Sequence, residues 1–163
     1  RYDNDAAEYL ILQDSRTHRH LGSVRLLRTT GPHMLADVFP FLCEGDVPRG
    51  PHIGEITRLI VSPSVPYRER QAVRNQVARA TIEYALMTGI EKFTAVCEMS
   101  MLSQILASGW RVDPLGLPQS VDGSMIGALI LHVEANSISK TRDAWRHPGP
   151  ALRIVERAQA LAA

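Results

Sequence analysis

Cysteine is scarce in this sequence, since Cys43 and Cys97 lie far apart and neither belongs to a CxxC pair. Such sparse cysteines argue against a disulfide framework and against a zinc ribbon. No run approaches the roughly 20 apolar residues that span a bilayer. The first residues also lack the basic-then-apolar order of a secretion signal. These absences predict a soluble, cytoplasmic protein with free thiols and no membrane partner.

The motifs of several common enzyme classes are missing as well. Nothing fits the phosphate loops GxGxxG or GxxxxGK[ST], and no serine lies in a GxSxG elbow. His18 and His20 flank Arg19 in a predicted turn, but no third residue has the spacing of a metal ligand. Cys97 ends a predicted buried strand with no neighbouring base, which is typical of a core thiol. We therefore expect neither a metal site nor a serine or cysteine nucleophile.

Strong charge of one sign is also absent, because the formal net charge is only +1. This balance argues against a nucleic-acid partner. Between positions 67 and 80, however, arginine far outnumbers the single Glu69. Arg68, Arg70 and Arg74 are candidates for docking an acidic protein partner, because Arg70 and Arg74 lie one helical turn apart. A solvated helix face explains these three arginines equally well.

What is present fits one globular domain, since 163 residues with 45% apolar and 21% charged side chains can bury a sufficient core. Short apolar runs bounded by turn residues predict strands. The predicted strands are Glu8–Gln13, His20–Leu27, His52–Ser62, Lys92–Cys97, Trp110–Val112 and Met125–Val133.

Helical spacing occurs between these runs. Residues 69–88 are predicted to bury Val73, Val77, Ala80, Tyr84 and Met87, with Gly89 as the C-cap. Residues 100–108 are predicted to bury Met101, Leu102, Ile105 and Leu106, and further helices are expected between Pro32 and Pro40 and from Pro150 to Ala163. Alternating strands and helices predict an α/β (α+β) fold, one mixed sheet flanked by helices.

Three charges lie in stretches that otherwise look buried: Arg25 in GSVRLL, and Glu55 and Arg58 in GEITRLIV. Ionised side chains are seldom buried without partners, so these charges predict a shared polar site. Because side chains alternate along a strand, Glu55 and Thr57 should project to one face and Arg58 to the other. Either the charges serve two surfaces, or a β-bulge near Thr57 turns one of them. A structural ion pair is the alternative to a functional site.

Four segments, in this order, resemble the N-acyl-homoserine lactone synthases of bacterial quorum sensing, the LuxI-type autoinducer synthases. They are the YD motif that ends at Asp3, GSVRLL with Arg25, PHMLADVF with Phe39, and the ExxR motif from Glu55 to Arg58. The following helix, the KFTAV strand and MLSQILASGW extend the likeness over nearly the whole chain.

The resemblance implies a GNAT-like acyltransferase fold, with a twisted mixed sheet that opens into a V-shaped cleft between the GEITRLIV and KFTAV strands. It implies transfer of an acyl chain from an acyl-carrier-protein or acyl-CoA thioester to the amine of S-adenosylmethionine. Lactonisation then releases the acyl-homoserine lactone and 5′-methylthioadenosine. S-adenosylmethionine is a co-substrate in this reaction, and no metal or prosthetic group is implied.

Residue types at the matching positions suit this chemistry. Glu55 is the candidate base for the amine, directly or through one water. Arg25 or Arg58 matches the substrate carboxylate and would also organise Glu55. The remaining candidates are Asp3 and Phe39 for S-adenosylmethionine, backbone amides near Thr57 and Leu59 for the oxyanion, and Ala95 for the acyl chain.

The chain also departs from the family pattern. Thr57 stands where serine is common, and Ala95 stands where members that favour 3-oxo chains have threonine, so an unsubstituted chain is expected. The segment SPSVPYRERQAVRNQ contains no glycine, which counts against cradling of the pyrophosphate of coenzyme A. We interpret residues 1–163 as a single synthase domain whose N-terminal segment is absent. Two alternatives remain: a GNAT-like N-acyltransferase without lactone formation, and a non-catalytic module that binds an acyl carrier or small ligand.

Overall fold

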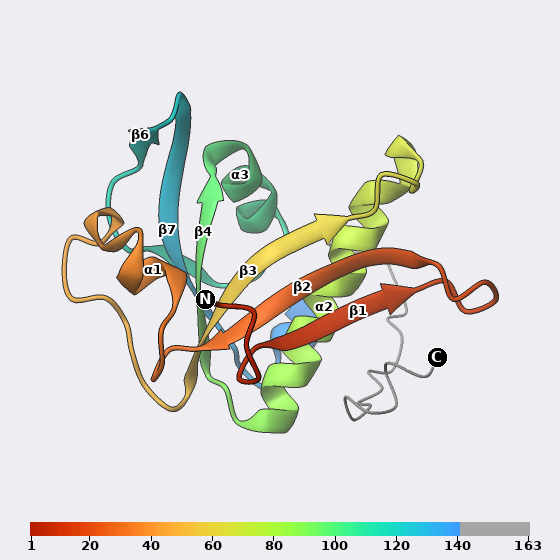
Figure 1. Cartoon of the computed structure of the whole chain (residues 1–163), viewed down its shortest axis with the longest axis horizontal. Coiled ribbons are helices and arrows are strands. Elements are labelled where there is room, and N and C mark those ends of the chain that lie inside the picture. The colour runs from red at the N-terminus through yellow and green to blue at the C-terminus, as the bar shows by residue number, and fades with distance from the viewer. Residues whose placement is uncertain (141–163) are drawn as a thin grey trace.

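A computed structural model describes residues 1–140 and contains one seven-stranded sheet, in the order β1-β2-β3-β4-β7-β5, with β6 paired to β7 (Figure 1). The strands are β1 (Glu8–Gln13), β2 (His20–Arg28), β3 (Ile53–Val61), β4 (Lys92–Glu98), β5 (Val112–Pro114), β6 (Gln119–Val121) and β7 (Ser124–His132). The helices are α1 (Met34–Asp37), α2 (Arg70–Thr88) and α3 (Met99–Ala107), with 3₁₀ turns η1 (Pro40–Leu42) and η2 (Tyr67–Glu69). The predicted helix from Pro150 to Ala163 lies outside the described residues.

The sheet is mixed, as the alternation of elements predicted. Strands β3 and β4 pair in parallel, and the other described pairs are antiparallel. The parallel pair requires a crossover, which α2 supplies, and Gly89 ends this helix in the left-handed conformation as predicted. Within residues 1–140, no helix combines the length and the apolar character needed to cross a membrane.

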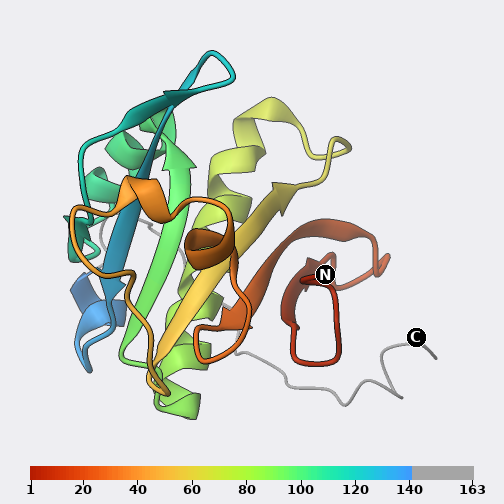
Figure 2. The same ribbon diagram turned by 60° about the vertical axis from the view of Figure 1, so that its left-hand side comes forward.

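Helices lie on both faces of the sheet (Figure 2). Helix α2 packs against β1, β2 and β3, and the main core lies between them, with Phe93, Ile82 and Ala85 almost fully buried. On the other face, α1 and η1 contribute Leu35 and Leu42 to a smaller cluster with Ala128 of β7. The sheet therefore separates two environments, one beneath α1 and one beneath α2 and α3.

The middle of the sheet splits open, which confirms the predicted cleft. Strands β3 and β4 pair only from Ile53–Lys92 to Ile56–Ala95. Beyond this point β3 continues along β2 while β4 continues along β7, and Figure 2 shows the two strands diverging. We call the opening beyond Ile56 and Ala95 the strand gap.

Some sequence predictions were wrong in detail. Met87 and Leu106 were expected to be buried but are 61% and 57% exposed. Met87 lies in the last turn of α2, and Leu106 is on the solvent side of α3. Each side chain continues the apolar spacing of its helix, but neither packs against the sheet. Strand β5 begins at Val112 and not at Trp110, and β6 was not predicted. Three-residue strands carry too few alternating positions to give a pattern.

Candidate active site

A β-bulge in β3 borders the strand gap. Thr57 pairs with Arg25 and Ile60 pairs with Ser23, so that Arg58 and Leu59 together oppose one residue of β2. Arg58 has a φ of 50°, in the left-handed region. A bulge turns a side chain away from strict alternation. The predicted bulge is therefore confirmed, and it brings the Arg58 side chain to the face that carries Arg25 and Thr57.

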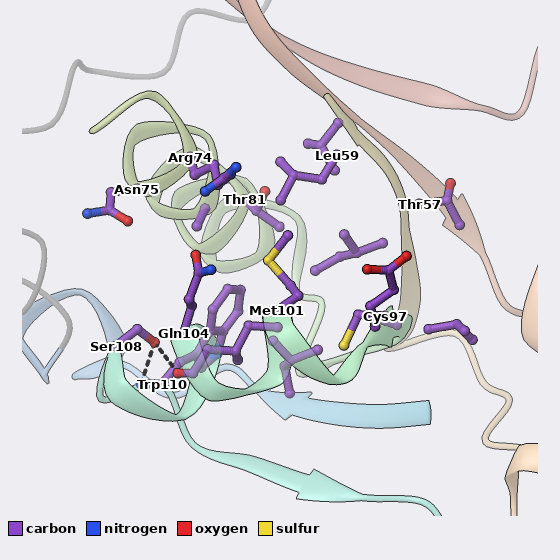
Figure 3. Close-up of a pocket in the computed structure, with 18 of the residues that line it drawn as sticks. Thr57, Leu59, Arg74, Asn75, Thr81, Cys97, Met101, Gln104, Ser108 and Trp110 are labelled. Atoms are coloured by element: carbon purple, nitrogen blue, oxygen red, sulfur yellow. Dashed lines mark hydrogen bonds between the residues drawn. The ribbon is translucent and has the colours of Figure 1, made fainter. Parts of the chain in front are cut away.

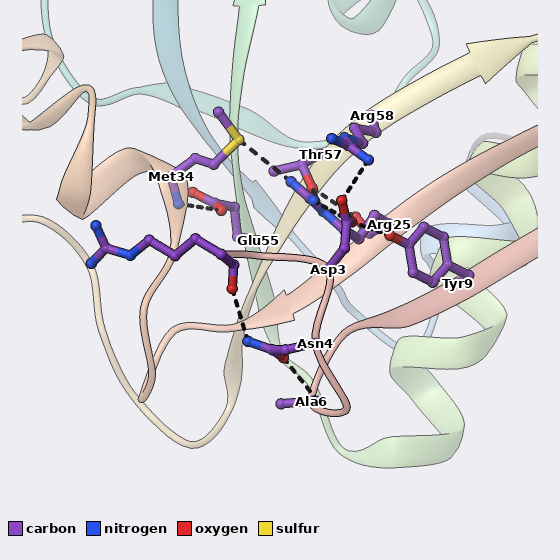
Figure 4. A network of polar contacts seen from close by, with 10 residues as sticks. Asp3, Asn4, Ala6, Tyr9, Arg25, Met34, Glu55, Thr57 and Arg58 are labelled. Carbon is purple, nitrogen blue, oxygen red and sulfur yellow. Dashed lines mark hydrogen bonds and ion pairs between the residues drawn. The ribbon is translucent and has the colours of Figure 1, made fainter. Parts of the chain in front are cut away.

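The two arginines meet on one carboxylate (Figure 4). Oδ1 of Asp3 lies 2.6 Å from Nη1 of Arg25, and Oδ2 lies 2.8 Å from Nη1 of Arg58. Tyr9 of β1 donates a further hydrogen bond from its hydroxyl to Asp3. The Tyr9 hydrogen bond, followed by that from Arg25, lowers the pKa of Asp3 to about 2. Asp3 is thus an ionised bridge between β2 and the bulge.

Arg25 and Arg58 differ sharply in exposure, at 2% and 55% of the side chain. The buried Arg25 donates from Nε to Oγ1 of Thr57 at 2.9 Å and from Nη2 towards the sulfur of Met34 at 3.5 Å. Its guanidinium also lies over the ring of Tyr2, 5.8 Å from the centroid. The Arg25 guanidinium is therefore held by contacts within the protein, whereas one edge of the Arg58 guanidinium is open to solvent.

Glu55 is buried, with 1% of its surface exposed, and it holds the start of α1. Its two oxygens accept hydrogen bonds from the backbone amides of Met34 at 2.8 Å and Leu35 at 2.6 Å. These are the first amides of the helix, which have no partner within it. A carboxylate offers about four lone-pair sites, so these two bonds orient Glu55 without using all of its capacity.

The expected contact between Glu55 and the two arginines is indirect. Met34 connects the groups, because its amide binds Glu55 and its sulfur faces Arg25. Within the described part of the chain, the carboxylate that neutralises both guanidinium groups is that of Asp3. Phe39 lies beyond α1, packs edge-on against Phe41 at 6.2 Å between ring centroids, and belongs to the cluster beneath α1.

A cavity of about 410 Å³ lies on the opposite face of the sheet, beneath α2 and α3 (Figure 3). The predicted acyl and oxyanion residues Thr57, Leu59 and Ala95 line it, together with Cys97. Burial raises the pKa of the Cys97 thiol to about 11, so the thiol is protonated at neutral pH. The helices contribute further lining residues, among them Arg74, Thr81, Met101, Gln104, Ile105 and Trp110.

Thr57 belongs to both environments. Its hydroxyl accepts the hydrogen bond from Arg25 on the α1 face, and the residue also lines the cavity on the α2 face. The strand gap at this residue is free of the β3–β4 ladder, so backbone amides of the bulge do not pair with β4. A group on the α1 face and a group in the cavity can therefore approach each other there.

The three arginines predicted to dock a carrier protein lie in different settings. Arg70 donates to the carbonyls of Val65 at 3.1 Å and Pro63 at 3.3 Å, and so holds the loop before α2. Arg74 lines the cavity and donates to Gln71 at 3.3 Å. Arg68 is 87% exposed at its side chain and lies beside Glu69. The three side chains therefore have different partners.

Sequence reasoning gave no site role to Tyr9, Tyr2 or Trp110. Strict alternation along EYLILQ does place Tyr9 opposite Arg25 once β1 and β2 are paired, so pairing the two predicted strands in register was the missing step. Trp110 was predicted to begin a strand but lies just before β5, and the contact of Tyr2 with Arg25 spans a turn that no periodicity encodes.

Comparison with known proteins identifies the family. The family model described as autoinducer synthase matches residues 1–141. An isovaleryl-homoserine lactone synthase of Bradyrhizobium diazoefficiens is 32% identical over 164 residues, which cover 96% of this chain and 73% of that protein.

Solved structures agree. The CoA-dependent acyl-homoserine lactone synthase MesI superposes with a TM-score of 0.81 and 32% identity, covering 91% of this chain and 73% of the other. BjaI, a CoA-dependent synthase solved with SAM and isopentyl-CoA, superposes with a TM-score of 0.80 and 28% identity. The match covers 99% of this chain and 77% of the other. An N-acetyltransferase from Lactobacillus plantarum, at a TM-score of 0.56 and 17% identity, covers 81% and 73% and shares the fold alone, so the GNAT-like prediction is confirmed. The chain belongs to the autoinducer synthase family.

Proposed function

We propose that this chain is an acyl-homoserine-lactone synthase whose two substrates bind on opposite faces of the sheet and react through the strand gap. S-adenosylmethionine occupies the α1 face, and the acyl thioester occupies the cavity beneath α2 and α3. One observation carries this assignment: Thr57 contacts the charged network on one face and the cavity on the other. The name of the Bradyrhizobium relative and the SAM and acyl-CoA complex of BjaI support it.

The first chemical requirement is a neutral amine. The amine of S-adenosylmethionine is protonated in water and attacks a thioester only after it loses a proton, so a carboxylate base is needed. Glu55 is the buried carboxylate of the α1 face, and two amide donors hold it in one orientation. It takes the proton directly or through one water. The same two hydrogen bonds make it a support for α1, so its replacement has a structural consequence as well.

Recognition of S-adenosylmethionine follows from the charges beside Glu55. The half-exposed guanidinium of Arg58 offers a free edge to the substrate carboxylate, while Arg25 is buried and orients Thr57 and Asp3. Asp3 remains ionised and complements the positive sulfonium and amine. Phe39 supplies an aromatic surface at the end of α1. Planar guanidinium groups suit carboxylates because they bind both oxygens.

The oxyanion of the tetrahedral intermediate forms in the strand gap. Backbone amides of the bulge around Thr57 and Leu59 lack partners in β4 and are the donors proposed for this oxygen. Collapse of the intermediate expels the thiol of the carrier. The carboxylate of the acylated product then displaces 5′-methylthioadenosine from the carbon next to sulfur, which closes the lactone. Holding the chain folded for this intramolecular step is the contribution of the protein.

The acyl donor is a thioester of coenzyme A or of an acyl carrier protein. Both carry a pantetheine arm, and polar side chains of α2 that include Arg74 line the solvent side of the cavity where such an arm enters. The CoA-dependent relatives MesI and BjaI favour coenzyme A. The glycine-free loop before α2 favours a carrier protein. The product is a quorum-sensing signal made in the cytoplasm, where both thioesters occur.

The test is release of 5′-methylthioadenosine from S-adenosylmethionine by purified full-length protein, given acyl-CoA or acyl carrier protein donors. We expect release only when both substrates are present. Glu55→Gln should reduce it by roughly 10²- to 10⁴-fold, the usual contribution of a general base. Glu91→Gln, at an exposed carboxylate away from the gap, is the matched control. Acyl transfer without methylthioadenosine would indicate a plain N-acyltransferase, and no reaction with any donor would overturn the enzyme assignment.

A further inference from the structure

The cavity beneath α2 and α3 has a polar end and an apolar end. Side chains of α2 at the solvent side are polar, among them Gln71 and Arg74. At the other end, Thr81 and Leu131 are each 2% exposed and Trp110 is 7% exposed. This second end is closed, because Trp110 and Leu131 belong to the main core and Thr81 is buried on α2. We call these three residues the closed wall.

The closed wall offers almost only carbon to the cavity. The hydroxyl of Thr81 donates to the carbonyl of Val77 at 2.9 Å, within α2. The indole Nε1 of Trp110 donates to the carbonyl of His132 at 3.0 Å, and its backbone amide donates to Ser108. The Ser108 hydroxyl in turn donates to Ile105 at 2.6 Å. Each polar hydrogen at this end already has a backbone or side-chain acceptor.

The distance from the strand gap to the wall limits what fits. In Figure 3, Thr57 and Cys97 lie at one side of the cavity and Ser108 and Trp110 at the other, with α3 between them. From Met101 to Ser108, α3 rises roughly 10 Å at about 1.5 Å per residue. An extended chain advances about 1.2 Å per bond, as the extended polypeptide backbone does. An acyl chain whose carbonyl carbon lies level with Met101 therefore meets the wall after about eight carbons.

We propose that Trp110, backed by Thr81 and Leu131, sets the acyl specificity of this enzyme: it accepts unsubstituted chains up to about eight carbons long and excludes longer or distally polar ones. This inference rests on the proposed function, since it assigns the acyl group to this cavity. Each carbon short of the wall adds buried apolar surface. Each carbon beyond it requires displacement of a packed indole.

The experiment compares acyl thioesters of four to twelve carbons by kcat/KM, with methylthioadenosine release as the readout. For the wild type we expect kcat/KM to rise to about eight carbons and to fall at least tenfold by twelve, the scale of discrimination by methylenes in a closed pocket. An ω-hydroxyoctanoyl thioester should react roughly ten- to a hundredfold more slowly than octanoyl, because its hydroxyl finds no partner at the wall.

Two variants enlarge the closed end in different ways. Trp110→Leu removes most of the wall. Ile105→Ala, on α3 beside it, leaves the hydrogen bond from Trp110 to His132 in place. This second variant provides the test if Trp110→Leu does not fold. Both should move the optimum by two or more carbons while the KM for S-adenosylmethionine stays within twofold. Leu106→Ala, one residue along α3 but exposed, is the matched control and should leave the profile unchanged.

The outcomes separate this inference from the proposed function. If methylthioadenosine is released but kcat/KM does not depend on chain length, the proposed role of the closed wall is wrong and the synthase assignment stands. The same conclusion follows if the folded Ile105→Ala variant has the chain-length profile of the wild type. A wild-type optimum at twelve carbons or more overturns that role as well. Absence of release with every donor contradicts the proposed function itself.

Discussion

The two faces of the sheet at the strand gap differ in how they can bind a substrate. On the α1 face, Asp3, Arg25, Glu55 and Thr57 are fixed by paired charges and hydrogen bonds, and the site is already organised before a substrate arrives. On the α2 face the walls are largely apolar and enclose a volume of about 410 Å³. Recognition of an invariant charged substrate needs fixed dipoles, whereas a hydrocarbon chain needs only a cavity of the right shape.

The largest effect that tests this comparison concerns Arg25. Arg25→Met removes a buried cation that holds Asp3 and Thr57, so we expect a loss of roughly 3 kcal/mol in the free energy of unfolding, the scale for breaking a buried pair, together with loss of activity. Urea denaturation measures the first and methylthioadenosine release the second. Arg58→Met removes a half-exposed cation and should change stability by less than about 1 kcal/mol while raising the KM for S-adenosylmethionine.

Equal stability losses in the Arg25 and Arg58 variants would contradict this division of roles. An unchanged KM for S-adenosylmethionine in Arg58→Met would remove Arg58 from substrate recognition. The acyl side of the gap provides the internal control for Arg25→Met, because Arg25 does not line the cavity and its replacement should not alter the preference among acyl chains.

A smaller effect separates the three arginines near the start of α2. Arg74→Glu should raise the KM for the donor several-fold, more at low than at high salt, because Arg74 is a partly exposed cation that lines the cavity. Arg68→Glu should do so only for a carrier-protein donor, whose surface extends beyond the cavity. Arg70→Gln should lower stability by about 1 kcal/mol through loss of its carbonyl bonds with little kinetic change. Identical kinetic responses of all three variants would indicate that the three arginines act as a single docking surface.

The smallest effect is the acid dependence due to Asp3. Its pKa is lowered from 3.8 to about 2 in the folded protein, so the carboxylate contributes stability above the unfolded value and this contribution is lost as the pH falls through about 2. The difference in stability between the wild type and Asp3→Asn should therefore be constant above pH 5 and shrink progressively below pH 4. A difference that persists to pH 2 would show that the Asn variant is destabilised for another reason.

Much of the fold could be predicted because its signals are local. Alternation over residues 8–13 gives β1 with the observed bounds, and the 3.6-residue spacing with Gly89 gives α2. The bulge was one of two interpretations of the Glu55-to-Arg58 spacing, and it follows from the conflict between strict alternation and a shared site. The short β6 and the side of α3 that faces solvent carry no such signal.

The sequence indicated which residues belong to the site better than it indicated the contacts between them. Buried charge marked Arg25 and Glu55, and both are almost fully buried. That Asp3 bridges the two arginines, and that Glu55 binds the first amides of α1, depends on contacts between residues 20 or more positions apart. Such pairings follow from strand register and helix placement, which a single sequence does not specify.

The most direct test of the account is the structure of a ternary complex with S-adenosylmethionine and a non-cleavable thioether analogue of the acyl donor. We predict the substrate amine on the α1 face and the acyl chain beneath α2 and α3, with the amine about 3–3.5 Å from the donor carbon across the gap at Thr57, the distance of a reactive pair. Both ligands bound on one face of the sheet, or an acyl chain outside the cavity, would contradict it.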